Sequence, residues 1–268
     1  MPDWRAGIRR GDLRYPQLRT RVRDGELLAG TFVKSRDPAT AEALAVSGYD
    51  FIAADLEHSA LSVADVEGIV RACDCHDVPV IARLPAAGLG LCGPLLDIGV
   101  SGIQVSDVSS AAAAKAARNA AHYPPVGERS LSLSTRAARF GVVPAALHVP
   151  ASLAQTVLIG QIESAQGVAA LDEIIESDVF DALFIGPTDL SLALRHAGQL
   201  DHPDVAAALD VAIETITGSG TALGIFCANV EQALQWADRG LTLLAIGTDL
   251  STLAAAGRST LGQLRARS

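Results

Sequence analysis

Several residue types are scarce in this chain of 268 residues, and each scarcity removes a class of protein. No apolar stretch is long and uninterrupted enough to span a bilayer, and no signal-peptide pattern opens the chain. The net charge of −9 argues against nucleic acid as the main partner, because phosphate binding needs a basic surface. We therefore expect a cytoplasmic protein that binds neither nucleic acid nor membrane.

Cysteine is also rare, and its spacing excludes the common redox and zinc motifs. Cys73 and Cys75 are two positions apart, which is neither a C-x-x-C motif nor a zinc knuckle. Cys92 and Cys227 lie among apolar residues. We expect all four thiols to be buried and reduced, as is usual in the cytosol.

Lysine is scarcer still, since the chain has only Lys34 and Lys115. An enzyme that works through a Schiff base needs a lysine that points into its active site. Lys115 falls in an Ala-rich helical pattern and is expected to face solvent. Lys34 follows the first predicted strand and is the sole imine candidate, although a surface loop position is the better prediction. This distribution argues against catalysis through a lysine imine.

Aliphatic residues are abundant by contrast. Hydrophobic residues make up 49% of the sequence and aromatic residues only 4%, which suits parallel strands covered on both faces. Eight apolar runs alternate with helical patterns, and this favours a (β/α)8 TIM barrel over an open doubly wound sheet. The expected strands are Leu28–Val33, Phe51–Asp55, Val78–Arg83, Gly102–Val105, Val157–Ile162, Ala182–Ile185, Ala222–Phe226 and Leu243–Ile246. The expected helices include Pro38–Ser47, Val63–Cys75, Ala111–His122, Gly167–Glu176, Pro203–Gly218 and Val230–Arg239.

No linker or shift in composition marks a second domain. We expect a single barrel domain over residues 18–268, preceded by a polar, Arg-rich tail over residues 1–17 that leads into an N-terminal helix. The segment Tyr123–Pro150 is long, carries four prolines and separates the fourth and fifth strands. Long insertions at the C-terminal face of a barrel usually shape the substrate site, and we expect this segment there.

Two acidic stretches follow neighbouring predicted strands. Gln161–Ser164 contains Glu163, and Ile185–Leu190 contains Asp189. Either acid alone fits a helix cap. A parallel barrel, however, places both at the same end of adjacent strands, where two carboxylates can share one divalent cation. Oxygen-only ligation favours Mg²⁺ or Mn²⁺ over a structural zinc ion, and the open positions suit a 2-oxo acid.

A histidine and an arginine follow two earlier strands. His58 lies just past the second strand beside Asp55 and Glu57, and a nearby carboxylate can raise the basicity of an imidazole. The alternative is a histidine satisfied by a backbone group. Arg83 ends the third strand, where it either pairs with one of these acids or stabilises an enolate that develops on the substrate.

At these residues the sequence resembles the HpcH/HpaI aldolase family of metal-dependent pyruvate aldolases. The resemblance runs from about Leu18 to near Leu264, and its landmarks are many and in order. They are Gly48–Asp50, Asp55–His58, Asp97–Gly99, Tyr123–Arg129, Arg136–Gly141, Gln161–Ser164, Ile185–Leu190 and Ala245–Asp249.

The resemblance implies roles for the candidate residues. Glu163 and Asp189 would hold a divalent metal, which is Mg²⁺, Mn²⁺ or Co²⁺. His58 would be the base, acting through water and supported by Asp55. Arg83 would stabilise the pyruvate enolate.

The resemblance also implies a substrate contact and an assembly. The backbone of Gly186, Pro187 and Thr188 would grip the pyruvate carboxylate, and Asp97 would reach the site of a neighbouring subunit. The fold would be a barrel of the phosphoenolpyruvate/pyruvate type. The protein would be a homohexamer, a trimer of dimers that exchange their C-terminal helices.

The implied activity is that of a class II aldolase, a carbon–carbon lyase that reversibly cleaves a 4-hydroxy-2-oxo acid to pyruvate and an aldehyde. Leu56 and Ser130 stand where the family more often has glycine, and they leave the aldehyde undefined. A CoA-thioester lyase of the citryl- or malyl-CoA type and an oxaloacetate decarboxylase use the same metal–enolate site and are the alternatives. A catalytically silent barrel that serves as a binding protein is the alternative of another class.

Overall fold

The computed structural model describes residues 16–266, and eight parallel strands close on themselves in chain order there. All eight expected strands are present, with ends that differ by up to two residues. A third strand that begins at Val80, after Pro79, is the clearest shift. The strands are β1 (Leu28–Val33), β2 (Phe51–Asp55), β3 (Val80–Leu84), β4 (Gly102–Val105), β5 (Val157–Ile162), β6 (Ala182–Ile185), β7 (Ala222–Cys227) and β8 (Leu243–Thr248). The (β/α)8 barrel is therefore confirmed.

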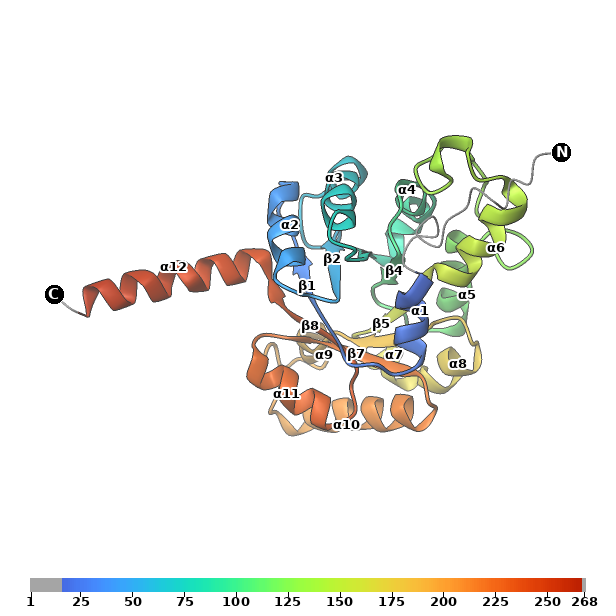
Figure 1. The fold of residues 1–268 in the computed structure, drawn as a ribbon. Coiled ribbons are helices and arrows are strands. Elements are labelled where there is room, and N and C mark those ends of the chain that lie inside the picture. The colour runs from blue at the N-terminus through green and yellow to red at the C-terminus, as the bar shows by residue number, and fades with distance from the viewer. Residues whose placement is uncertain (1–15, 267–268) are drawn as a thin grey trace.

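Helices surround the strands and cover the barrel on its outside (Figure 1). The α-helices are α1 (Pro16–Arg23), α2 (Pro38–Val46), α3 (Val63–Asp74), α4 (Cys92–Ile98), α5 (Ala111–Ala121), α6 (Ala145–Gln155), α7 (Ala165–Ala169), α8 (Leu171–Glu176), α9 (Pro187–Ala193), α10 (Pro203–Gly218), α11 (Val230–Asp238) and α12 (Asp249–Arg265). Two short 3₁₀ helices are η3 (Ala86–Leu91) and η4 (Arg139–Gly141). No helix in this part of the chain is long and apolar enough to cross a membrane.

The strands are almost wholly buried because both of their faces pack against apolar groups. One cluster of aliphatic side chains fills the space between strands and helices. A second cluster fills the inside of the barrel, where the rings of Phe32 and Phe184 meet edge to face with centroids 6.5 Å apart. The register aligns the strand ends, so that Asp55 lies opposite Arg83 on the neighbouring strand. Polar residues at these ends are thereby brought to one mouth.

Helix α1 closes the opposite end of the barrel. Leu18 and Val22 pack into the inner apolar cluster. Arg19 and Arg23 both pair with Asp181, which directly precedes β6 and so marks the N-terminal end of the strands. The expected N-terminal helix is confirmed, and the Arg-rich residues before it lie outside the described residues. The C-terminal end is left as the open mouth.

The position expected for Tyr123–Pro150 is wrong. This segment follows α5 and therefore belongs to an αβ connection, on the N-terminal side of the barrel. Its Ala137 donates a backbone hydrogen bond of 2.9 Å to Asp97 at the end of α4, which leads into β4. A cavity of about 190 Å³ between this segment, α4 and α6 thus lies away from the mouth.

The expectation for the thiols fails only at Cys75, which is exposed.

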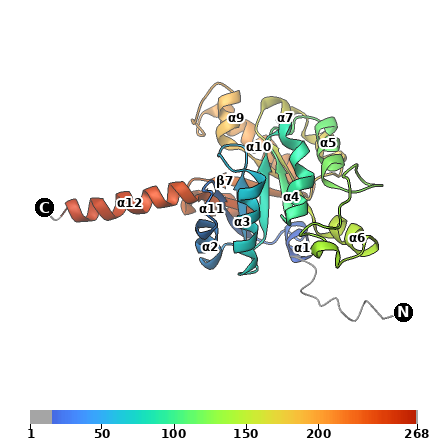
Figure 2. The same ribbon diagram turned by 90° about the horizontal axis from the view of Figure 1, so that it is seen from above.

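Helix α12 projects away from the barrel, as two perpendicular views show (Figures 1 and 2). Every described residue of this helix after Asp249 is exposed. Four leucines recur along it at helical spacing: Leu250, Leu253, Leu261 and Leu264.

Candidate active site

The ends of β2 and β3 hold a buried ion pair. Asp55 has no exposed surface, and Arg83 is 8% exposed. The guanidinium grips the carboxylate with two nitrogens, Nε to Oδ1 at 3.0 Å and Nη2 to Oδ2 at 2.6 Å. It also lies 4.3 Å from the centre of the Phe32 ring. This fork fixes the Arg83 side chain and leaves Nη1 as the nitrogen that Asp55 does not engage.

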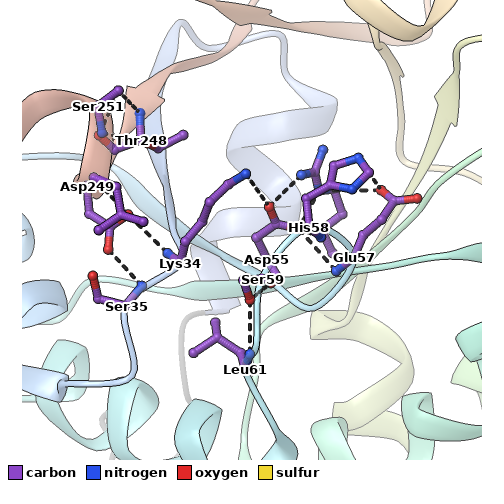
Figure 3. A network of polar contacts seen from close by, with 12 residues as sticks. Lys34, Ser35, Asp55, Glu57, His58, Ser59, Leu61, Thr248, Asp249 and Ser251 are labelled. Carbon is purple, nitrogen blue, oxygen red and sulfur yellow. Dashed lines mark hydrogen bonds and ion pairs between the residues drawn. The ribbon is translucent and has the colours of Figure 1, made fainter. Parts of the chain in front are cut away.

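The same carboxylate organises the turn that follows β2. Its Oδ1 accepts the backbone N–H groups of Glu57 and His58, both at 3.1 Å. Burial opposes the ionisation of Asp55, but the hydrogen bonds and charge of Arg83, the backbone N–H of His58 and the charge of Lys34 together hold its pKa below the ordinary value. The His58 ring is half exposed, and its Nε2 lies 3.9 Å from Oε2 of Glu57 (Figure 3). Asp55 thus holds the backbone of His58, and Glu57 is the acid beside the His58 ring.

Glu163 follows β5 and is 9% exposed. One of its oxygens accepts the backbone N–H of Asp107 at 2.9 Å, and the other accepts the side-chain amide of Gln161. Ser106, the residue before Asp107, donates its hydroxyl to Glu57. The turn after β4 therefore bridges the two glutamates and places them at one mouth.

Asp189 lies in the first turn of α9, directly after β6, and is partly buried. Gly186 at the start of that turn makes the close approach possible, because a Cβ there would come within 2.6 Å of Oε2 of Glu163. The amide of Gly186 is already bonded to the carbonyl of Ile162, and Pro187 has no N–H. Within residues 16–266, the N–H groups of Thr188 and Asp189 have no hydrogen-bond acceptor, as is usual in the first turn of a helix.

The electrostatics of Glu163 are unusual for a glutamate. Burial raises its pKa to about 7, and the negative charges of Glu57 and Asp189 act in the same direction, while the hydrogen bond from Gln161 opposes them. Within residues 16–266, no cationic side chain forms an ion pair with it. The mouth therefore concentrates negative charge around a carboxylate that lacks a counter-charge.

Sequence reasoning missed several polar residues at this mouth. Glu57 was named only as a neighbour of His58 and a possible partner of Arg83. Gln161 was named only as part of the stretch that contains Glu163, and Ser106 was given no role. Gln104 donates to Gln161 at 2.5 Å, which in turn orients Glu163. Both glutamines lie within strands that are otherwise apolar and buried. A polar residue in such a strand needs a hydrogen-bond partner, and this requirement would have drawn attention to them.

Lys34 is the clearest correction. A surface loop was expected, yet its side chain is only 24% exposed and its Nζ lies 3.3 Å from Oδ2 of Asp55. Lys34 directly follows β1, so it lies at the same end of the barrel as Asp55. The order of residues in the sequence was enough to predict this position.

Asp97 stands apart from the other predicted residues. It lies near the end of α4, on the N-terminal side of the barrel, and its Oδ1 accepts a hydrogen bond of 2.5 Å from Arg129. Arg129 stacks on Tyr123, with its guanidinium carbon 4.4 Å from the ring centre. Within one chain, Asp97 therefore holds Arg129.

A different cluster joins His196, His202 and Asp204 in the connection from α9 to α10. Its ligand atoms lie within 4.8 Å of one another, as a metal site would require. The two rings stack with centroids 3.4 Å apart, and Asp204 bonds to His196 at 3.1 Å. His202 caps the first turn of α10 through its ring. Helix capping and stacking account for the cluster.

A family model described as HpcH/HpaI aldolase/citrate lyase matches residues 28–256, which include every strand of the barrel and the whole mouth. The chain belongs to this family. The hydroxypyruvate/pyruvate aldolase of Pseudomonas aeruginosa is 34% identical to it over 255 residues, covering 95% of this chain and 94% of that protein. The 2-dehydro-3,6-dideoxy-6-sulfogluconate aldolase of Pseudomonas putida is 32% identical, over 89% of this chain and 92% of its own.

Solved structures agree with the HpcH/HpaI assignment. The crystal structure of an HpcH/HpaI aldolase/citrate lyase family protein from Burkholderia cenocepacia J2315 superposes with a TM-score of 0.88 at 32% identity. The match covers 93% of this chain and 99% of that one. The resemblance read from the sequence is therefore confirmed.

Proposed function

We propose that this HpcH/HpaI protein is a divalent-metal-dependent class II aldolase that reversibly cleaves a 4-hydroxy-2-oxo acid to pyruvate and an aldehyde. The observation that carries the proposal is the convergence of Glu163, Asp189 and Arg83 on one barrel mouth. The names of its aldolase relatives support the same reaction class. One of those names includes hydroxypyruvate, which makes hydroxypyruvate a second donor to test.

The residues present fit a divalent cation. Glu163 is a nearly buried carboxylate that faces two further carboxylates, and burial without a counter-charge raises its pKa to about 7. Such an environment is costly for an anion unless a cation binds there. Glu163 and Asp189 would hold the ion, and their oxygen ligands suit Mg²⁺, Mn²⁺ or Co²⁺. When bound, it would polarise the 2-oxo group of the substrate.

The chain's own residues bind and orient the oxo acid. The free N–H groups of Thr188 and Asp189 are the donors that the first turn of α9 offers to its carboxylate. Gly186 contributes room for this approach, since its own amide is engaged. Arg83, locked by Asp55 through two nitrogens, directs its remaining Nη1 toward the 2-oxo oxygen that gains negative charge.

His58 moves the proton in this proposal. It takes the proton of the 4-hydroxyl, directly or through water, as the C3–C4 bond breaks and the aldehyde leaves. The bonding electrons pass to the 2-oxo oxygen, and protonation at C3 completes pyruvate. Glu57 lies beside the His58 ring and can stabilise the imidazolium that forms.

Exchange of the pyruvate methyl protons with deuterium tests the first half of the reaction without an aldehyde. We expect metal-dependent exchange in the wild-type protein and none in Glu163→Ala or Asp189→Ala, because neither variant retains the carboxylate pair. His58→Ala should slow the exchange. Full exchange by either acid variant in the presence of a chelator would refute the site, and exchange unchanged in His58→Ala would remove that residue from the base role.

The assembly is part of the proposal. We propose a homohexamer built as a trimer of dimers, in which α12 is exchanged between subunits and Asp97 supports a neighbouring site. The exposure of Leu253 and Leu264, at 72% and 67%, supports a partner for α12. Sedimentation analysis of the full chain would test this, and a monomer at micromolar concentration would contradict it. We place the protein in the cytoplasm, in keeping with its unpaired thiols.

A further inference from the structure

Lys34 brings a second cation to the carboxylate that already holds Arg83. Its side chain reaches from the end of β1 to Asp55 (Figure 3). Oδ2 of Asp55, which Lys34 contacts, also accepts a hydrogen bond from Arg83. Asp55 is fully buried, whereas the Lys34 side chain is 24% exposed. Part of the Lys34 side chain is therefore open to solvent, although its ammonium contacts the buried carboxylate of Asp55.

The ammonium of Lys34 is surplus to the needs of Asp55. Both carboxylate oxygens are already engaged by the Arg83 fork, and Oδ1 also accepts two backbone N–H groups. Lys34 adds an ion pair at 3.3 Å. Among residues 16–266, its Nζ has no other acceptor, and an ammonium carries three donors. Donors thus remain for a ligand that enters the mouth.

The backbone that carries Lys34 is held in place. Asp249, which is 5% exposed, accepts the N–H groups of Lys34 and Ser35 at 3.1 Å and 2.9 Å. A second cation follows on the same turn, since Arg36 bonds to the carbonyl of Ala60 beyond His58. Asp37 follows on the same turn and Asp65 lies 4.0 Å from Arg36, so the positive charge that this rim of the mouth offers a ligand comes from Lys34.

The order of the strands around the barrel places Lys34 across the mouth from Glu163 and Asp189. Glu163 and Asp189 follow β5 and β6, whereas Lys34 follows β1, on the other side of an eight-stranded ring. Arg83 and His58 come from the strands between. A pyruvate held at β5 and β6 leaves the side toward β1 for the second substrate.

We propose that Lys34 is a specificity-determining residue that binds a carboxylate group on the aldehyde substrate. This inference rests on the proposed aldolase function. The free donors of Lys34 form a charge-assisted hydrogen bond with the distal carboxylate, while the aldehyde carbon faces the donor substrate. The protein therefore prefers oxo acids with an aldehyde group to neutral aldehydes of the same length.

Aldol addition to pyruvate tests this preference with two matched pairs of aldehydes. The pairs are 4-oxobutanoate with butanal, and glyoxylate with acetaldehyde, so that the reach of the lysine need not be known in advance. The variants are Lys34→Met and Lys34→Arg. Lys115→Met is the matched control, because Lys115 is an exposed lysine on α5.

We expect Lys34→Met to lower kcat/KM for the carboxylated aldehyde of at least one pair by about tenfold to a hundredfold, as loss of a charged hydrogen bond predicts. The neutral partner should be unaffected, Lys34→Arg should retain the preference, and the control should match the wild type. An equal fall for charged and neutral aldehydes would overturn the proposal and make Lys34 a positioning residue for Asp55. No change in any rate would overturn it as well.

Deuterium exchange into pyruvate separates this proposal from the proposed function. If the wild type and Lys34→Met both exchange the methyl protons but show no preference among the aldehydes, only the role of Lys34 fails. If the wild type shows no exchange with Mg²⁺, Mn²⁺ or Co²⁺, the aldolase function fails and the Lys34 proposal fails with it.

Discussion

Replacing Glu163 by glutamine should stabilise the metal-free protein at neutral and alkaline pH. In the folded state the carboxyl group has a pKa of about 7, raised from 4.5 mainly by burial. Between these values the folded state retains a proton that the unfolded chain has lost, so the free energy of unfolding falls as the pH rises. Glutamine has a similar shape and no charge, and it removes this penalty.

The magnitude follows from the size of the shift. A difference of about 2.5 pKa units corresponds to about 3 kcal/mol at 1.36 kcal/mol per unit. The penalty is absent below the unfolded-state value and is complete above pH 7. It is a large effect beside a typical total stability of about 5–15 kcal/mol.

Urea unfolding in chelator measures the effect at one fixed protein concentration. The wild type should lose about 3 kcal/mol more than Glu163→Gln between about pH 4.5 and pH 8, because all other titrating groups are shared. A second series with Mg²⁺ should stabilise the wild type far more at pH 8 than at pH 5, since the proton competes with the ion. The variant should gain little from Mg²⁺ at either pH.

Parallel pH curves for the two proteins would refute the reasoning, because they would show that Glu163 ionises in the folded state as easily as in water. Stabilisation of the variant by Mg²⁺ equal to that of the wild type would separately show that the ion binds elsewhere.

Two further predictions concern the packing of the mouth. Asp55→Ala should lower the free energy of unfolding by about 3–5 kcal/mol, because it leaves the buried Arg83 without its main partner, and a loss below 1 kcal/mol in urea unfolding would contradict this. Gly186→Ala should weaken Mg²⁺ binding measured by calorimetry, because its Cβ would displace Glu163. The control Gly218→Ala adds a methyl group with no atom within 4 Å and should bind Mg²⁺ like the wild type. If Gly186→Ala also bound Mg²⁺ like the wild type, the turn would accommodate the methyl group and the prediction would be wrong.

The strands were predictable because burial on both faces leaves long aliphatic runs, and such runs are visible in the sequence. The ion pair between Asp55 and Arg83 was among the alternatives, since residues at the ends of adjacent parallel strands become neighbours. The true place of Tyr123–Pro150 was also available. It follows a helical pattern, and a connection from helix to strand lies at the N-terminal end of a barrel.

Other features required coordinates. No pattern in the sequence shows that a Cβ at Gly186 would clash with Glu163. The two residues follow different strands, and the sequence does not specify the direction of the Glu163 side chain. The link from Ser106 to Glu57 likewise depends on the path of the turn after β4, in which Asp107 has a φ of 49°. Residue types and strand ends predict which polar residues gather at the mouth, but turn geometry decides which acids face each other.

Lys34 shows how far composition can be trusted when chemistry is inferred. The scarcity of lysine argued against an imine mechanism, and the structure supports that argument in a different way, because the ammonium is held 3.3 Å from Asp55. A lysine held in an ion pair with a buried carboxylate is not placed to attack a carbonyl, as an imine-forming nucleophile must. The ion pair that occupies Lys34 also fixes its position, and a lysine held at the rim of the mouth is suited to binding an anionic substrate.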